Sequence, residues 1–167
     1  KSLIREIMNS QTYQMNSEND LDKIKIDPEN TFLWKQNSRR LDAESIRDTI
    51  LYVGDNLQSS EGGPSIKPGT KTEYGYIFKS STRSIYNPVF RNTLPEIMQV
   101  FDFADPNMVT GKRTNSSVPT QALYMLNSSF IRENSINAAK KFTQEFNTDN
   151  SSKTKNAYKK VLGRIPS

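Results

Sequence analysis

The side chains best suited to chemistry lie between Arg83 and Asn127, where charged and amide groups alternate with aliphatic and aromatic ones. Arginine suits a planar carboxylate or phosphate, because its fork donates two parallel hydrogen bonds. The segments between Arg83, Arg91 and Arg113 are long enough to fold back, so we expect the three arginine side chains to converge. Pairing with aspartates of the same fold is the first expectation, and ligand binding is the alternative. The candidate binding residues are Arg83, Arg91, Asp102, Asp105, Asn107, Arg113 and Gln121.

A second group of charges surrounds a predicted helix start. Asp42 has the type and position of an N-cap, and a carboxylate near a helix N-terminus is stabilised by the helix dipole. We therefore expect a structural charge cluster that ties this helix to the segment 83–127, with an anion-binding or carboxylate-bearing cleft as the alternative. The cluster consists of Arg39, Arg40, Asp42, Glu44, Arg47 and Asp48.

The absence of cysteine and histidine excludes several chemistries. The chain contains neither residue, so a disulfide framework, a thiolate nucleophile and a Ser-His-Asp triad within this chain are ruled out. Zinc favours the same two ligands. Asp102, Asp105 and Asn107 are spaced loosely like a calcium loop but lack its alternating acids and distal glutamate. We therefore predict no metal site, and no cofactor within this chain.

The net charge of +5 is concentrated at the C-terminal end, where residues 121–167 carry eight basic and three acidic side chains. Nucleic acid is one partner for such a surface. The lysines lack nearby stacking aromatic side chains apart from Tyr158, however, so we expect a solvated helix surface, with nucleic-acid binding as the alternative. No run of about 18 apolar residues is present, and we expect no membrane span.

Hydrophobic periodicity and caps predict a mainly α fold: an irregular helical domain with one small β-hairpin and long ordered loops. The hairpin is predicted from two aromatic-rich runs, 74–78 and 83–87. Pro95 is predicted to open a short helix and Gly163 to close the last one. The helices are expected at 2–14, 43–57, 96–101, 120–126, 129–146 and 153–162, and the long loops at 16–37 and 102–119.

The two ends of the chain resemble cut points. Lys1 is followed at once by an amphipathic helical pattern, and Gly163–Ser167 stands where another element would begin. We expect a single α-helical domain over residues 1–167 that is a fragment of a larger multidomain protein.

Six motifs in a fixed order resemble one known family, and together they cover nearly the whole chain. They are RRLDAESIRDTIL (39–51), GGPS (62–65), RSIYNPVFRN (83–92), FDFADPNMVTGKR (101–113), VPTQALYMLNSSF (118–130) and LGRIPS (162–167). The sequence resembles the C-terminal domain of unknown function in large planctomycete-type surface proteins, many of which also carry a planctomycete-type cytochrome c domain. The resemblance implies an extracytoplasmic location, at the cell surface or in the periplasm. Any haem would lie in the separate cytochrome domain.

Two function hypotheses follow. The first is a non-catalytic interaction module of an exported protein linked to a cytochrome c domain or to polymer processing, whose partners are other domains of the same polypeptide, a glycan or a protein. The second is an enzyme domain that uses carboxylates and arginines on an anionic or sugar substrate. The resemblance supplies no catalytic residues, so we assign none and favour the first hypothesis.

Overall fold

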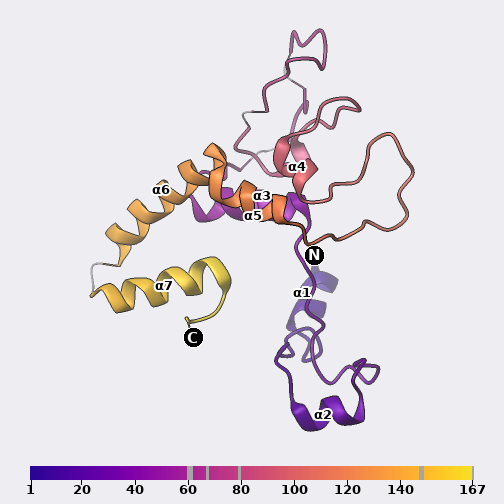
Figure 1. Cartoon of the computed structure of the whole chain (residues 1–167), viewed down its shortest axis with the longest axis vertical. Helices are drawn as coiled ribbons and strands as arrows, with labels where there is room; N and C mark the ends of the chain where they lie inside the picture. The colour runs from indigo at the N-terminus through magenta and orange to yellow at the C-terminus, as the bar shows by residue number, and fades with distance from the viewer. Residues whose placement is uncertain (60–61, 67, 79, 147–148, 167) are drawn as a thin grey trace. The chain divides into compact units, whose positions relative to one another are not determined.

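The computed structural model describes residues 1–59, 62–66, 68–78, 80–146 and 149–166. Helices joined by long loops make up this part of the chain (Figure 1). The chain divides into two compact units, Lys1–Arg40 and Leu41–Ser167. The helices are α1 (Ser2–Asn9), α2 (Leu21–Ile26), α3 (Ala43–Val53), the 3-10 helix η1 (Ser84–Tyr86), α4 (Glu96–Val100), α5 (Pro119–Asn127), α6 (Ser129–Glu145) and α7 (Asn150–Leu162).

The first unit contains α1 and α2. The helix predicted for residues 2–14 ends early, because the Ser10 hydroxyl donates to the Ile7 carbonyl at 2.7 Å and accepts from the Tyr13 backbone N–H at 3.2 Å. Helix α2 lies in a stretch predicted as loop. The Asp20 side chain caps it by accepting from the backbone N–H groups of Asp22 and Lys23.

A tight loop follows α2 and is organised by Asp27. The Asp27 carboxylate accepts from the backbone N–H groups of Thr31 and Phe32 at 2.9 and 2.8 Å. The indole N–H of Trp34 donates to the Asp27 carbonyl oxygen at 3.0 Å. The Phe32 bond, followed by the Thr31 bond, holds the pKa of the Asp27 carboxyl below its ordinary value of 3.8, although desolvation opposes this shift.

The Asp27 loop should therefore loosen in acid. A carboxyl whose pKa is lower in the folded state stabilises that state fully above the unfolded pKa, and this contribution is lost as the pH falls through the folded value. Trp34 is the single tryptophan, so its fluorescence reports on the loop. We expect a fluorescence change as the pH is lowered below 3.8, and a smaller pH-dependent step in Asp27→Asn. Identical titrations of the two proteins would contradict this assignment.

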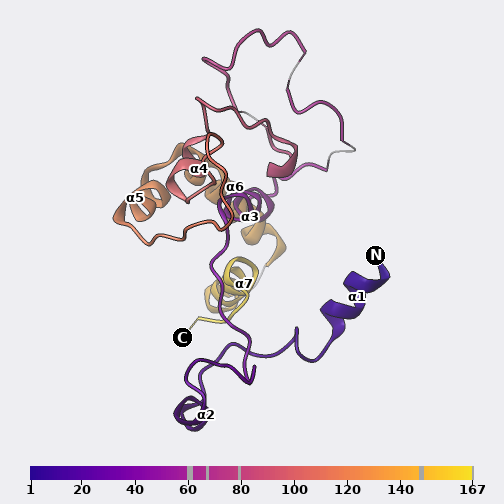
Figure 2. The same ribbon diagram turned by 90° about the vertical axis from the view of Figure 1, so that its right-hand side faces the viewer.

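The second unit is built around α3. Helix α3 contacts α4, α6 and η1, while α5 contacts α4 and α6, and α7 contacts α6 (Figures 1 and 2). The core of this unit combines four buried residues from α3, α4 and α5: Ala43, Ile97, Met98 and Tyr124. The rings of Phe101 and Tyr124 meet edge to face, with centroids 6.1 Å apart. A small apolar core of this kind agrees with the polar composition of the chain.

Helix α3 begins as predicted, because the Asp42 side chain accepts from the backbone N–H of Ser45 at 2.8 Å. It ends at Val53, earlier than residue 57. The backbone N–H groups of Asn56 and Leu57 both bond to the Leu51 carbonyl and turn the chain away. Ile46 and Ile50 are partly buried against the core, while Ala43, Arg47 and Leu51 are the buried residues of the helix. A charged side chain therefore lies on the most buried face.

The predicted β-hairpin is wrong. Residues 84–86 form η1, and the described residues contain no strand, only one isolated bridge between Gln58 and Thr82. A strand would need the backbone N–H of Ser84 for a partner strand. Here that N–H donates to the carboxylate of Asp48 at 2.8 Å, while the N–H groups of Tyr86 and Asn87 close i→i+3 turns. The mainly α prediction itself is confirmed.

The C-terminal helices agree well with the sequence. A bend at Ser128 separates α5 from α6, and Gly163 ends α7 with a φ of 69°, a left-handed conformation that suits glycine. Helix α7 starts at Asn150, earlier than predicted, because Asp149 caps it through the backbone N–H of Ser152. Within the described residues, none of the helices combines the length and the apolar character that a membrane crossing requires.

Candidate functional site

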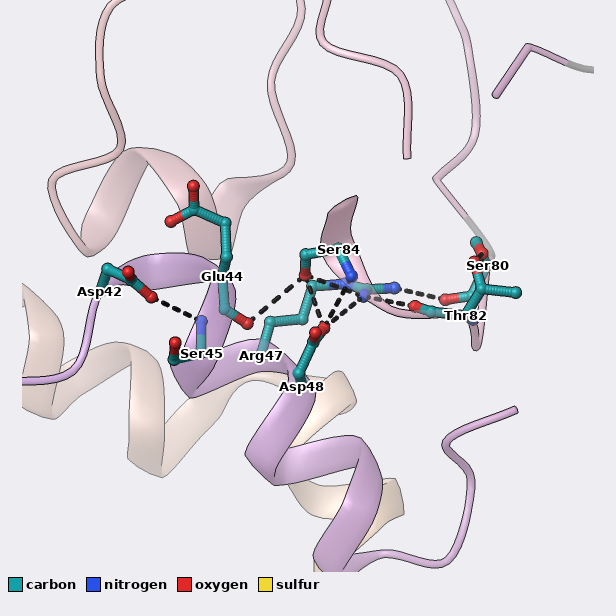
Figure 3. Close-up of polar contacts among 8 residues, drawn as sticks. All are labelled: Asp42, Glu44, Ser45, Arg47, Asp48, Ser80, Thr82 and Ser84. Atoms are coloured by element: carbon teal, nitrogen blue, oxygen red, sulfur yellow. Dashed lines mark hydrogen bonds and ion pairs between the residues drawn. The ribbon is translucent and has the colours of Figure 1, made fainter. Parts of the chain in front are cut away.

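The centre of the site is the buried side chain of Arg47. This arginine is only 6% exposed. Its Nη1 donates to the carbonyl oxygen of Thr82 at 3.0 Å and to the Ser84 hydroxyl at 3.2 Å, and its Nη2 donates to the carbonyl oxygen of Ser80 (Figure 3). Burial lowers the pKa of Arg47 and the charge of Asp48 opposes that shift. Arginine stays protonated in proteins, so this is a buried cation.

Asp48 supplies the matching negative charge. Its Oδ1 lies 3.4 Å from Arg47 Nη1 and accepts from both the hydroxyl and the backbone N–H of Ser84, at 2.7 and 2.8 Å. The Ser84 hydroxyl also lies 3.4 Å from the Glu44 carbonyl oxygen (Figure 3). The Arg47–Asp48–Ser84 network thus holds η1, together with Ser80 and Thr82 just before it, against one face of α3.

A cleft with a volume of about 620 Å³ lies beside this network. Its walls come from the first two turns of α3, from η1 and the residues after it, from α4, and from Phe103 and Arg113 in the loop that follows α4. Aliphatic residues and prolines contribute much of the lining. They are Ile85, Pro88, Val89, Leu94, Pro95 and Met98.

Five charged residues also line this cleft: Asp42, Glu44, Asp48, Arg83 and Arg113. Each of the three carboxylates already accepts a hydrogen bond from the protein. Asp42 caps α3, Asp48 holds Ser84, and Glu44 forms an ion pair with Arg113 at 2.7 Å. The guanidinium of Arg113 also lies 5.1 Å from the centre of the Phe103 ring.

Arg83 differs from the other charged residues of the cleft. Only its backbone carbonyl is engaged, by the N–H of Tyr86, and its exposed guanidinium has neither an ion-pair nor a hydrogen-bond partner among the described residues. The side-chain amide of Asn87 likewise has none in this part of the chain, although its backbone N–H bonds to Ser84. Both residues line the cleft.

The remaining predicted residues organise loops. Asp102 accepts from the backbone N–H and the hydroxyl of Ser116 at 2.7 and 2.8 Å, which closes a long loop. Asp105 accepts from the backbone N–H of Asn107 at 2.8 Å, as in a common aspartate turn. The Asn107 amide donates to the Arg91 carbonyl. No group of three or more acidic side chains within the described residues is arranged to hold a metal ion.

Gln121 is buried and joins three segments. Its amide donates to the carbonyl oxygens of Val100 and Ser116, at 3.1 and 3.3 Å, and its oxygen accepts from the backbone N–H of Val118 at 3.4 Å.

Of the residues predicted from the sequence, Arg83 and Arg113 lie in one cleft with Asp42, Glu44 and Asp48. Arg91, Asp102, Asp105, Asn107 and Gln121 do not line that cleft.

Sequence reasoning did not single out Ser84 or Asn87. Serine and asparagine are abundant in this chain, so neither residue is conspicuous by its type. One usable signal was present: Arg47 lies four residues after Ala43 and four before Leu51, which places it on an apolar helical stripe. An arginine at such a position needs acceptors from another segment, because buried charges are paired or hydrogen-bonded.

One family model matches the chain over residues 1–167, and its description is PSD1, a protein of unknown function (DUF1553). The chain belongs to the PSD1 family. The resemblance to a domain of unknown function is thereby confirmed, and the matching family model spans the whole chain. No curated protein and no solved structure is detectably similar to it.

The three carboxylates that line the cleft of this PSD1 chain are all held by other groups of the protein. A general base must be free to accept a proton from a substrate within hydrogen-bond reach. The cleft carboxylates are instead committed to a helix cap, a buried serine and an arginine. The arrangement can hold η1 rigidly and present Arg83 and Asn87 to a ligand.

Proposed function

We propose that this domain is a non-catalytic interaction module, and that the cleft between α3, η1 and α4 binds a segment of a partner protein. The supporting observation is an open cleft whose accessible surface is mostly apolar and whose η1 wall is fixed by hydrogen bonds, beside a cationic side chain without a partner in the described residues. Concave apolar surfaces with a few placed polar groups are typical of binding sites.

The exposed aliphatic residues at the cleft favour a protein partner. Ile85 is 82% exposed and Val89 is 52% exposed, and both line the cleft. Apolar side chains that stay exposed together with a concave surface are typical of protein-binding regions. Burying them against a partner removes apolar area from water, which contributes about 25 cal/mol per Å².

A glycan fits the cleft less well. Sugar rings commonly stack on exposed aromatic faces, and the one aromatic residue among the described lining residues is Phe103. Its ring is already covered by the guanidinium of Arg113 at 5.1 Å. The other apolar lining residues are aliphatic or proline.

The enzyme hypothesis remains the second candidate, acting on an anionic or sugar substrate. Its support is that three carboxylates and two arginines line one cleft. The hydrogen bonds that hold all three carboxylates argue against it, because each group would have to leave its protein partner before it could act on a substrate.

The cellular setting that we propose rests on the resemblance of the six motifs. It is an extracytoplasmic, multidomain protein of planctomycete type, linked to a cytochrome c domain or to polymer processing. In that setting the segment bound by the cleft belongs to another domain of the same polypeptide or to a neighbouring protein.

Filling the cleft should abolish binding. Short random peptides displayed on phage would be selected on the wild-type domain, resynthesised and titrated against Val89→Trp, which places an indole in the cleft. We expect affinity to fall about tenfold or more, as when a central contact of an interface is lost. Val109→Trp is the matched control, because Val109 is fully exposed and does not line the cleft.

Two results would overturn the proposal. The first is a set of peptides that bind both tryptophan variants equally. The second is a failure to select any peptide, together with an oligosaccharide whose binding Val89→Trp abolishes, which would identify the ligand as a glycan.

A further inference from the structure

We infer that the segment bound in the cleft carries an aspartate or glutamate with aliphatic neighbours, and that Arg83 and Asn87 together bind its carboxylate. This inference rests on the proposed function. It assigns the chemistry of the partner and the residues that recognise it.

The charge balance of the cleft is the first argument. Of the charged lining residues that the structure describes, Asp42, Glu44, Asp48 and Arg113 are all engaged by other groups of the protein. Arg83 is the exception. Asp48 is moreover neutralised by the buried Arg47, which lies 3.4 Å away. Arg83, the residue just before η1, is therefore the charged side chain of the cleft whose hydrogen-bond donors are all still available to a ligand.

The rigidity of η1 is the second argument. Arg83 and Asn87 flank η1, whose Ser84 is 7% exposed and is held by both its backbone N–H and its hydroxyl. The N–H groups of Tyr86 and Asn87 bond back to Arg83 and Ser84, at 3.0 Å each. The two unpaired side chains thus start from a fixed backbone, and preorganisation of this kind lowers the entropic cost of binding.

The donor chemistry is the third argument. A guanidinium offers parallel N–H groups that match the two oxygens of a carboxylate, and an amide offers two further donors. Both residues line the same cleft. A carboxylate accepts all of these bonds, whereas a lysine or arginine from the partner would accept none and would be repelled by Arg83.

The neighbouring side chains determine what flanks the acidic residue. Ile85 lies in η1, between Arg83 and Asn87, and Val89 lies two residues after Asn87. Apolar contacts from both sides exclude water and strengthen the charged hydrogen bond. The apolar lining continues to Leu94, which precedes α4, and to Met98 within α4. A segment that runs through the cleft would contact both regions, so we commit to an internal acidic side chain and not to a free C-terminus.

Peptide selection with matched arginine variants tests this inference. Phage-displayed random peptides would be selected in parallel on wild type, Arg83→Gln and Arg91→Gln. Arg91 is an exposed arginine whose guanidinium, like that of Arg83, has no partner among the described residues, but it lies outside the cleft. We expect wild type and Arg91→Gln to enrich an acidic residue between aliphatic ones, and Arg83→Gln to lose that enrichment.

Titrations of one selected peptide, synthesised with an amidated C-terminus, complete the test. We expect its affinity to fall about tenfold or more in Arg83→Gln, and by a similar factor when its acidic residue is replaced with the matching amide, since each change removes the same hydrogen bond between charged groups. Combining the two changes should lower the affinity little more than either change does alone. Arg83→Glu should instead select peptides with lysine or arginine.

The outcomes separate the inference from the proposed function. Peptides that lose affinity in Val89→Trp but bind Arg83→Gln as well as wild type would overturn the inference and leave the cleft as a protein-binding site. Peptides that require their free C-terminal carboxylate would also overturn it. Peptides insensitive to Val89→Trp would overturn both.

Discussion

Replacing Arg47 with alanine should lower the free energy of unfolding by about 3–5 kcal/mol, the range typical when one partner of a buried ion pair is removed. Three consequences add up. The Asp48 carboxylate loses its counter-ion, the carbonyl oxygens of Ser80 and Thr82 lose a donor, and a cavity is left in place of a side chain that is only 7% exposed. The measurement is equilibrium urea unfolding followed by circular dichroism.

The control for this change is Arg91→Ala. Arg91 is exposed and its guanidinium has no partner in the described part of the chain, so its loss should change stability by no more than about 0.5 kcal/mol. A loss below about 1 kcal/mol for Arg47→Ala would mean that the Arg47–Asp48–Ser84 network does not hold the fold together. Because this network fixes η1, the variant should also lose the peptide binding that we propose for the cleft.

Gly54→Ala should destabilise the domain by about 1–3 kcal/mol, the usual cost of forcing an extra carbon into a packed region. A Cβ at position 54 would lie 2.6 Å from Asn134 Oδ1, 2.9 Å from Asn134 Cβ and 3.1 Å from Asn134 Cα. Rotating the amide removes the first of these contacts only. The Cα belongs to the backbone of α6, so α3 and α6 would have to move apart.

The Asn134 side chain cannot move away without further loss. It is 5% exposed, its Oδ1 accepts from the Asn56 amide and its Nδ2 donates to the Phe130 carbonyl, both at 2.8 Å. Gly111→Ala is the matched control, because nothing lies within 4 Å of its added carbon. Thermal unfolding of the two variants gives the comparison. Equal melting temperatures would show that the close approach of α3 and α6 is absent in solution.

The helices that the sequence predicted correctly have local causes. Asp42 accepts from a backbone N–H three residues away, and Gly163 adopts the left-handed conformation that ends α7. Such caps act within one helical turn, and an unaligned sequence contains all of the information they require. The same locality explains why the bounds of α5 and α6 were close to those predicted.

The predicted hairpin failed because a side chain far away in the sequence binds one of its residues. Residues 83–87 have the aromatic and β-branched character of a strand, but Ser84 bonds to Asp48, which is 36 residues earlier in the chain. Propensity cannot report a partner that only folding brings close. Helix α2 was missed for another reason: its six residues are too few to show a helical period, although the Asp20 side chain caps it.

The candidate site shows the same division. Residue types and local spacing were enough to list the available charged residues, to remove the chemistries that need cysteine or histidine, and to place a helix start at Asp42. Folding is what buries Arg47, pairs Arg113 with Glu44 and leaves Arg83 at the cleft, where its side chain has no partner among the described residues. The physical reason is that ion pairing depends on distance in space, and between segments as far apart as 44 and 113 that distance is fixed by the packing of α3, η1 and α4.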